Sequence, residues 1–175
     1  MLFRSEVGQS PENPKRLAWT PGIAAAVNGP DGKTAHLVSA LEHGDALLHV
    51  EFMVPEGSNS GVYLQGRYEI QVLDSYGVEK PGYGDCGGIY QRYHEEKDWQ
   101  GDRGYEGRPP RVNAARKPGQ WQSFDITFRA PRFDANGAKT ENARFVKVVH
   151  NGVVVHENEP LTGPTRAAMF QDEKP

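Results

Sequence analysis

The sequence is poor in cysteine, in long apolar runs and in positive charge. Its 175 residues include one cysteine, Cys86, which excludes an internal disulfide and any metal site built from several cysteines. No apolar run approaches the roughly 20 residues that a membrane-spanning helix needs, and the N-terminus has no apolar signal-peptide core. The formal net charge is -3, whereas nucleic-acid binding usually requires a basic face. We therefore predict no membrane span in this chain and no nucleic-acid partner.

Turn-forming residues are abundant. The chain has 20 glycines and 13 prolines, with 37% apolar and 25% charged residues, a composition typical of a globular protein with many turns and few long helices. Its length fits one domain. We predict that residues 1–22, where prolines alternate with polar residues, form an irregular lead-in, and that residues 23–175 form a single domain. We further hypothesise that residues 1–5 are extraneous.

Alternation of apolar and polar residues predicts β-strands. The period of two that half-buried strands require occurs over residues 46–54, 61–65, 121–130, 143–149 and 153–157. Asn151-Gly152 separates the last two runs, and Asn-Gly favours a hairpin because both central residues of a type I′ turn need positive φ. Since no run has helical amphipathicity, we predict an all-β fold, an antiparallel β-sandwich, with a barrel as the alternative.

The hairpin near residue 66 decides which side chains share a face. A three-residue loop over residues 66–68 would place Gln65 opposite Glu69 and Tyr63 opposite Gln71. That register collects the polar residues Tyr63, Gln65, Glu69 and Gln71 on one face, and Val62, Leu64, Ile70 and Val72 on the other. A two-residue loop would mix the two sets, so we favour the three-residue loop.

Several sequence blocks, in this order, resemble the 3-keto-disaccharide hydrolase family. The blocks are Asn59-Ser60-Gly61, residues 68–75, Gly88-Ile89-Tyr90, residues 113–121, residues 130–134 and His150-Asn151-Gly152. The resemblance covers about residues 46–165 and implies a concanavalin-like jelly roll that holds sugar on a concave face. It also implies cleavage of a glycosidic bond in a sugar already oxidised to a ketone at C3.

The resemblance has two departures and one implication for localisation. Residues 92–107 form an insertion where the family has a shorter loop, so the mouth of the pocket is expected to differ. The family normally continues into further strands, so we interpret the chain as truncated at its C-terminus and lacking its closing strands. Family members are commonly exported from bacterial cells, which predicts a periplasmic or extracellular location for the intact protein.

Glu69 is the predicted catalytic residue. Glu69 and Asp74 are separated by roughly 16 Å along an extended strand, too far for the two-carboxylate glycosidase arrangement, which needs roughly 5 to 9.5 Å. A 3-keto sugar requires a different chemistry, because its ketone acidifies the C2 proton and one general base can remove it. We predict that Glu69 is this base and that elimination and hydration follow. The alternative is that Glu69 is a solvated strand residue.

Other residues are candidates for binding the substrate. They are Asn59, Tyr63, Gln65, Gln71, Asp74, Tyr90 and Trp121. Turn formation is an alternative for Asn59 and Asp74, and core packing is an alternative for Trp121.

The histidines and the cysteine carry weaker signals. We expect the strand histidines His49, His150 and His156 to face solvent, because no pair has the spacing of a metal site. The metal and any other cofactor stay unknown, with a divalent metal among the alternatives. Cys86 could be a nucleophile only with a nearby base, and no sequence signal supplies one.

The sequence thus predicts a hydrolase or lyase that acts on 3-keto-disaccharides or 3-keto-glucosides, with a carbohydrate as partner. A non-catalytic, lectin-like carbohydrate-binding module is the main alternative, since one sandwich fold serves both functions. A family member that acts on another sugar is a third.

Overall fold

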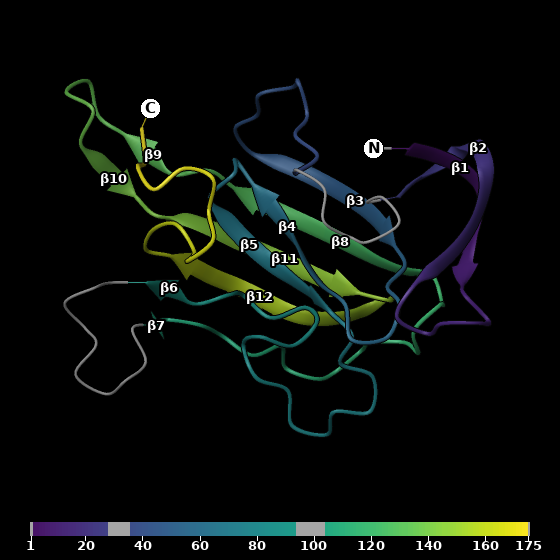
Figure 1. Ribbon diagram of the computed structural model, residues 1–175. Helices are drawn as coiled ribbons and strands as arrows, with labels where there is room; N and C mark the ends of the chain where they lie inside the picture. The colour runs from purple at the N-terminus through teal and green to yellow at the C-terminus, as the bar shows by residue number, and fades with distance from the viewer. Residues whose placement is uncertain (1, 28–35, 94–103, 175) are drawn as a thin grey trace.

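The computed structural model describes residues 2–27, 36–93 and 104–174 (Figure 1). In this part of the chain the regular elements are β-strands, and every strand pair is antiparallel. Two layers of strands face each other, with β4 and β5 in front of β8 and β11. The predicted all-β, antiparallel sandwich is confirmed. Among the described residues no helix is long and apolar enough to cross a membrane.

The first layer is a four-stranded sheet in the order β12-β11-β8-β3. Its strands are β3 (Ala46–Phe52), β8 (Gln122–Arg129), β11 (Ala143–His150) and β12 (Val153–Leu161). Alternate residues of β8 are buried, as the sequence pattern predicts. Asn151 and Gly152 join β11 to β12 with φ of 51° and 83°, which confirms the predicted hairpin.

The second layer is built on β4 (Asn59–Leu64) and β5 (Tyr68–Leu73). Ile89 extends it, because this residue bridges Ile70 on one side and Arg108 on the other. Ile89 and Arg108 lie outside the runs of alternating residues, yet they contribute backbone pairing to the layer that carries Glu69.

The turn between β4 and β5 corrects part of the predicted register. Leu64 pairs with Tyr68 and Tyr63 pairs with Glu69, so the loop comprises residues 65–67 rather than 66–68. Gln65 and Gly66 form the turn with φ of 54° and 63°. Gln65 is thus a turn residue and not a strand residue opposite Glu69. The physical reason is Tyr68, which enters the strand and packs its ring against Phe128 at a centroid distance of 5.5 Å.

The N-terminal segment also differs from the expectation. Residues 1–22 were expected to be irregular, but β1 (Leu2–Gln9) pairs with β2 (Leu17–Val27). Alternation was too weak in this segment to predict strands. Shorter paired strands are β6 (Arg92–Tyr93) with β7 (Gly104–Tyr105), and β9 (Arg132–Phe133) with β10 (Lys139–Glu141).

The C-terminal segment packs on the second layer, whereas residues 94–103 of the predicted insertion lie outside the described residues. After β12, residues 162–174 contain no strand. The backbone N–H groups of Thr165 and Met169 donate to the carbonyls of Arg67 and Gly66 at 2.9 and 2.8 Å, so this segment packs on the β4–β5 turn.

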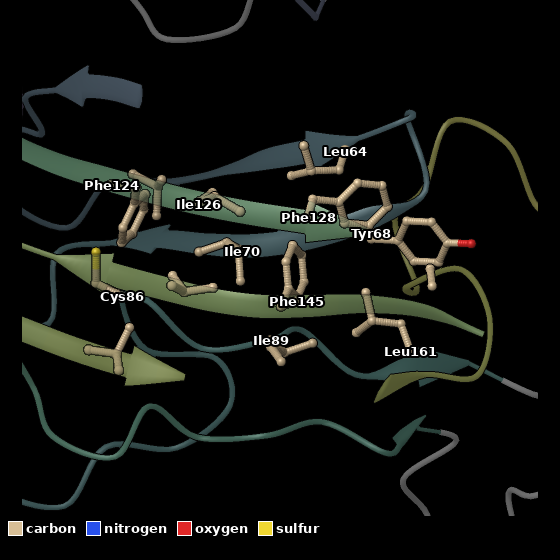
Figure 2. Close-up of a cluster of buried hydrophobic side chains, with 14 of the residues drawn as sticks. Leu64, Tyr68, Ile70, Cys86, Ile89, Phe124, Ile126, Phe128, Phe145 and Leu161 are labelled. Atoms are coloured by element: carbon tan, nitrogen blue, oxygen red, sulfur yellow. The ribbon is translucent and has the colours of Figure 1, made fainter. Parts of the chain in front are cut away.

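The core lies between the two layers (Figure 2). Tyr68 and Ile70 from β5 meet the phenylalanines of β8 and β11, and Phe128 and Phe145 lie 5.8 Å apart between ring centroids. These side chains are at most 2% exposed. Their burial supplies the main driving force for joining the layers, since each large apolar side chain removed from water contributes about 1.5–3 kcal/mol.

We expect Phe145→Ala to lower the free energy of unfolding by about 3–5 kcal/mol, because it removes a ring and leaves a cavity. Leu47→Ala is the matched control, since Leu47 is 84% exposed and should change stability by less than about 0.5 kcal/mol. Urea unfolding followed by tryptophan fluorescence measures both. Equal destabilisation by the two variants would contradict the described packing.

Candidate active site

The outer face of β5 carries buried polar side chains. Tyr68 and Ile70 of this strand point into the core and are 0% exposed, so Glu69 and Gln71 point to the opposite face. Even so, Glu69 is 5% and Gln71 is 3% exposed. A solvated strand residue would be far more exposed, so the structure does not support that alternative for Glu69.

Tyr63 and Gly61 shape the surroundings of the Glu69 carboxylate. Tyr63 lies directly opposite Glu69 in the β4–β5 register, so the two side chains are neighbours on one face, and hydrogen bonding to the phenol acts to lower the pKa of Glu69. A Cβ atom at Gly61 would lie 2.2 Å from Glu69 Oε1, so the carboxylate occupies space that only glycine leaves free. The strand pairing and the missing side chain together hold the acid in place.

One oxygen of the Glu69 carboxylate has no partner in the part of the chain that the structure describes. Glu69 Oε2 is buried and has no hydrogen-bond partner among the residues that the structure describes. Burial raises the pKa of Glu69, and the hydrogen bond from Tyr63 opposes part of that rise. A carboxyl group with a raised pKa is a stronger base once ionised, which is the property that a general base needs near neutral pH.

An amide pair extends the polar face along the hairpin. Gln71 Nε2 donates to Asn59 Oδ1 at 3.2 Å. Gln71 is buried while Asn59 is exposed, so this hydrogen-bonded pair extends from the neighbourhood of the Glu69 carboxylate to the protein surface. Two predicted substrate contacts, Asn59 and Gln71, are thereby brought into one hydrogen-bonded unit next to Glu69.

Tyr90 lies beside Glu69 on the other neighbouring segment. Its backbone N–H donates to the Glu69 carbonyl at 3.2 Å, and its ring meets that of Tyr83 edge to face, with centroids 5.8 Å apart. A Cβ atom at Gly107 would lie 2.5 Å from the Tyr83 ring, so Tyr83 is seated over a glycine. The sequence reasoning missed Tyr83, because it stands in a long segment without periodicity and only the fold brings it to Tyr90.

Three predicted site residues, Asp74, Gln65 and Trp121, do not lie in the group of polar side chains around Glu69. Asp74 Oδ2 accepts a hydrogen bond from the Gly57 N–H at 2.9 Å, which is the turn-capping alternative. Gln65 Nε2 donates to the His43 carbonyl at 2.9 Å from the turn. Trp121 precedes β8 and alternates with the buried Gln122, so it faces outward from the other layer and is 43% exposed.

Two histidines correct the expectation that strand histidines face solvent. His49 is exposed and pairs with Asp125 at 2.6 Å, but His150 and His156 are 0% and 2% exposed. His150 Nε2 lies 3.0 Å from Gln122 Oε1 and His156 Nε2 lies 2.7 Å from the Gly87 carbonyl. These polar partners, together with a shift of register between β11 and β12, allow both rings to enter the core.

Cys86 lies near a base but cannot use it. Its Sγ atom is 3.9 Å from His150 Nε2, and both residues are 0% exposed. Burial raises the pKa of the Cys86 thiol to about 11 and lowers the pKa of His150 to about 4. Both groups therefore stay neutral at pH 7, which excludes a thiolate–imidazolium pair. Among the described residues no group of three or more histidine, cysteine, aspartate or glutamate side chains could hold a metal ion.

We expect the Cys86 thiol to react slowly with a disulfide reagent at pH 8, because it is buried and its pKa is raised to about 11. The same protein in urea should react at the rate of a free thiol, whose pKa is about 8.5. Spectrophotometric thiol titration measures both rates. Rapid stoichiometric reaction of the folded protein would contradict a buried, protonated Cys86.

Comparison with known proteins gives one family and one solved structure. The family described as 3-keto-alpha-glucoside-1,2-lyase-like domain matches residues 11–174. A crystal structure from Parabacteroides distasonis ATCC 8503, described as a candidate glycosyl hydrolase, is 32% identical with a TM-score of 0.59. The match covers 78% of this chain and 55% of that one, so the chain spans just over half the length of this neighbour. No curated protein matches the chain.

Proposed function

The chain belongs to the family of 3-keto-alpha-glucoside-1,2-lyase-like domains, and from this we propose that it cleaves the glycosidic bond of 3-keto-disaccharides or 3-keto-glucosides. The family and the structural neighbour are both of glycoside-cleaving type. The observation that carries the proposal is Glu69, a buried carboxylate on a polar face, one oxygen of which has no partner among the described residues. A single base of this kind suits a sugar whose C2 proton is acidified by a neighbouring ketone.

The proposed reaction begins with proton transfer to Glu69. The carboxylate takes the C2 proton, and the electron pair of the C–H bond forms an enolate on the C3 oxygen. The enolate then reforms the ketone as the C1–oxygen bond breaks, leaving a C1–C2 double bond, and the departing alkoxide takes up a proton. Water adds to C1 and a proton returns to C2, so the net reaction is hydrolysis.

The surrounding residues suit the binding of a sugar. The exposed Asn59 amide, held by Gln71, can donate hydrogen bonds to sugar hydroxyls or to the oxygen that becomes the enolate. Tyr90 and Tyr83 present aromatic surfaces of the kind on which sugar rings stack. The pairing of Tyr90 with Glu69 and the contact of Tyr83 with Tyr90 support a role for these rings in binding the sugar.

We also propose that the intact protein acts outside the bacterial cytoplasm, in the periplasm or the extracellular space. This follows from the export that the family resemblance implies. Fractionation of the source organism with an antibody to the chain tests it, and recovery in the cytoplasm would contradict it.

We expect Glu69→Gln to lower kcat on a 3-keto-glucoside by about 10²–10⁴-fold, because the amide cannot accept the C2 proton. Glu51→Gln is the matched control, since Glu51 is an exposed residue of β3 in the other layer, and it should keep wild-type turnover. Release of the aglycone measures both rates. Equal turnover by Glu69→Gln and wild type would remove Glu69 from the mechanism.

Reaction in D₂O tests the chemistry itself. Elimination and hydration place deuterium at C2 of the product, because the proton that returns to C2 comes from solvent, and proton NMR should show loss of the C2–H signal. Direct hydrolysis would leave that hydrogen in place and would contradict the proposed route. Affinity for the sugar with no cleavage would instead favour the carbohydrate-binding module.

A further inference from the structure

Tyr63 has a closer relation to Glu69 than a substrate contact requires. The two residues are direct partners in the antiparallel register of β4 and β5, so their Cβ atoms lie side by side on the same face. This pairing brings the phenol beside the carboxylate, and hydrogen bonding between them acts to lower the pKa of Glu69. A hydroxyl that gives its proton to a carboxylate has no second proton to offer a sugar.

We infer that Tyr63 is a positioning residue for Glu69: its hydroxyl anchors the carboxylate in the space left by Gly61, so that Oε2, which has no partner among the described residues, is presented to the substrate. The inference rests on the proposed function, because it assigns a role relative to the base. It replaces the predicted role of Tyr63 as a substrate contact with a role that acts through Glu69.

Three observations on separate residues support this arrangement. Glu69 Oε1 fills the space that a Cβ atom at Gly61 would enter, at 2.2 Å. Glu69 Oε2 is buried and without a partner among the described residues. The edge of the Tyr63 ring meets His36 with centroids 6.4 Å apart. The carboxylate thus lies against the backbone at Gly61 and beside its cross-strand partner Tyr63.

The chemistry of the pair fixes the direction of the hydrogen bond. Burial and the neighbouring carboxylate both raise the pKa of Tyr63 above its ordinary value, so the phenol stays protonated and acts as donor. A hydrogen bond donated to a carboxylate favours the ionised form. Among the described residues, Tyr90 acts electrostatically on Tyr63, and His36 meets the Tyr63 ring. Tyr63 itself acts to lower the pKa of Glu69.

Tyr63→Phe tests the inference because it removes the hydroxyl and keeps the ring. We expect the Glu69 carboxyl to titrate at higher pH in the variant, because the ionised form loses a donor. Carbon-13 NMR of glutamate-labelled protein without substrate measures this titration. The acidic limb of the pH profile of kcat/KM should move upward by the same amount, and part of the lost rate should return at higher pH.

Tyr68→Phe is the matched control. It removes a tyrosine hydroxyl from β5 on the core face, where that hydroxyl donates to Glu173, and it should leave the titration of Glu69 unchanged. Thermal unfolding of both variants separates a loss of fold from a loss of positioning, since a purely structural role would lower stability without moving the titration.

Gly61→Ala is a second test from the backbone side. The new Cβ atom would collide with Glu69 Oε1, so we expect at least a tenfold loss of kcat while Tyr63 is intact. Gly44→Ala is its control, because a Cβ atom there meets nothing within 4 Å and activity should persist.

The outcomes separate the two claims. An unchanged Glu69 titration in Tyr63→Phe would overturn the inference even if the wild-type protein cleaves a 3-keto-glucoside. A shifted titration in a protein with no turnover would instead refute the proposed function and leave the pair without a base to position.

Discussion

The register of the β4–β5 hairpin is the constraint on which the site and the core both depend. The side chains of a strand alternate between its faces, so a slip of one residue would turn Glu69 into the core and Tyr68 outward. The turn at Gln65 and Gly66 fixes the register locally, with both residues at positive φ. The ring of Tyr68 against Phe128 fixes it through packing. The contact between Tyr68 and Phe128 therefore both fills the core and fixes the face on which Glu69 lies.

Burial of Glu69 ties function to a cost in stability. An ionised carboxylate out of water is unfavourable unless hydrogen bonds compensate it, and here Tyr63 supplies one bond while Oε2 has none among the described residues. A solvated glutamate at the same place would be more stable and a weaker base. Gly61 and Gly107 also serve the candidate site, because a larger side chain at either position would occupy the space of the Glu69 carboxylate or of the Tyr83 ring.

Alternation and turn chemistry were enough to predict much of the fold, because both are local properties of the chain. They located β3, β8, β11 and β12, the Asn151-Gly152 turn, and the shared face of Tyr63, Glu69 and Gln71. The errors arose where tertiary contacts decide. Tyr68 entered β5 to reach Phe128, and His150 and His156 were buried by partners distant in sequence. Strands β1 and β2 lacked alternation strong enough to reveal them.

The placement of the predicted site residues narrows the chemistry that the site can perform. Asp74 was the nearest acidic residue in sequence that could have formed a pair with Glu69, but one oxygen of its carboxylate accepts the Gly57 N–H in a turn. Double displacement and inversion both need two carboxyl groups across one glycosidic bond. Elimination from a 3-keto sugar needs one base and a means of stabilising an enolate. The buried carboxylate of Glu69, beside the Tyr63 phenol and near the exposed Asn59 amide, suits the second requirement, because the ketone of the substrate acidifies the proton that this base removes.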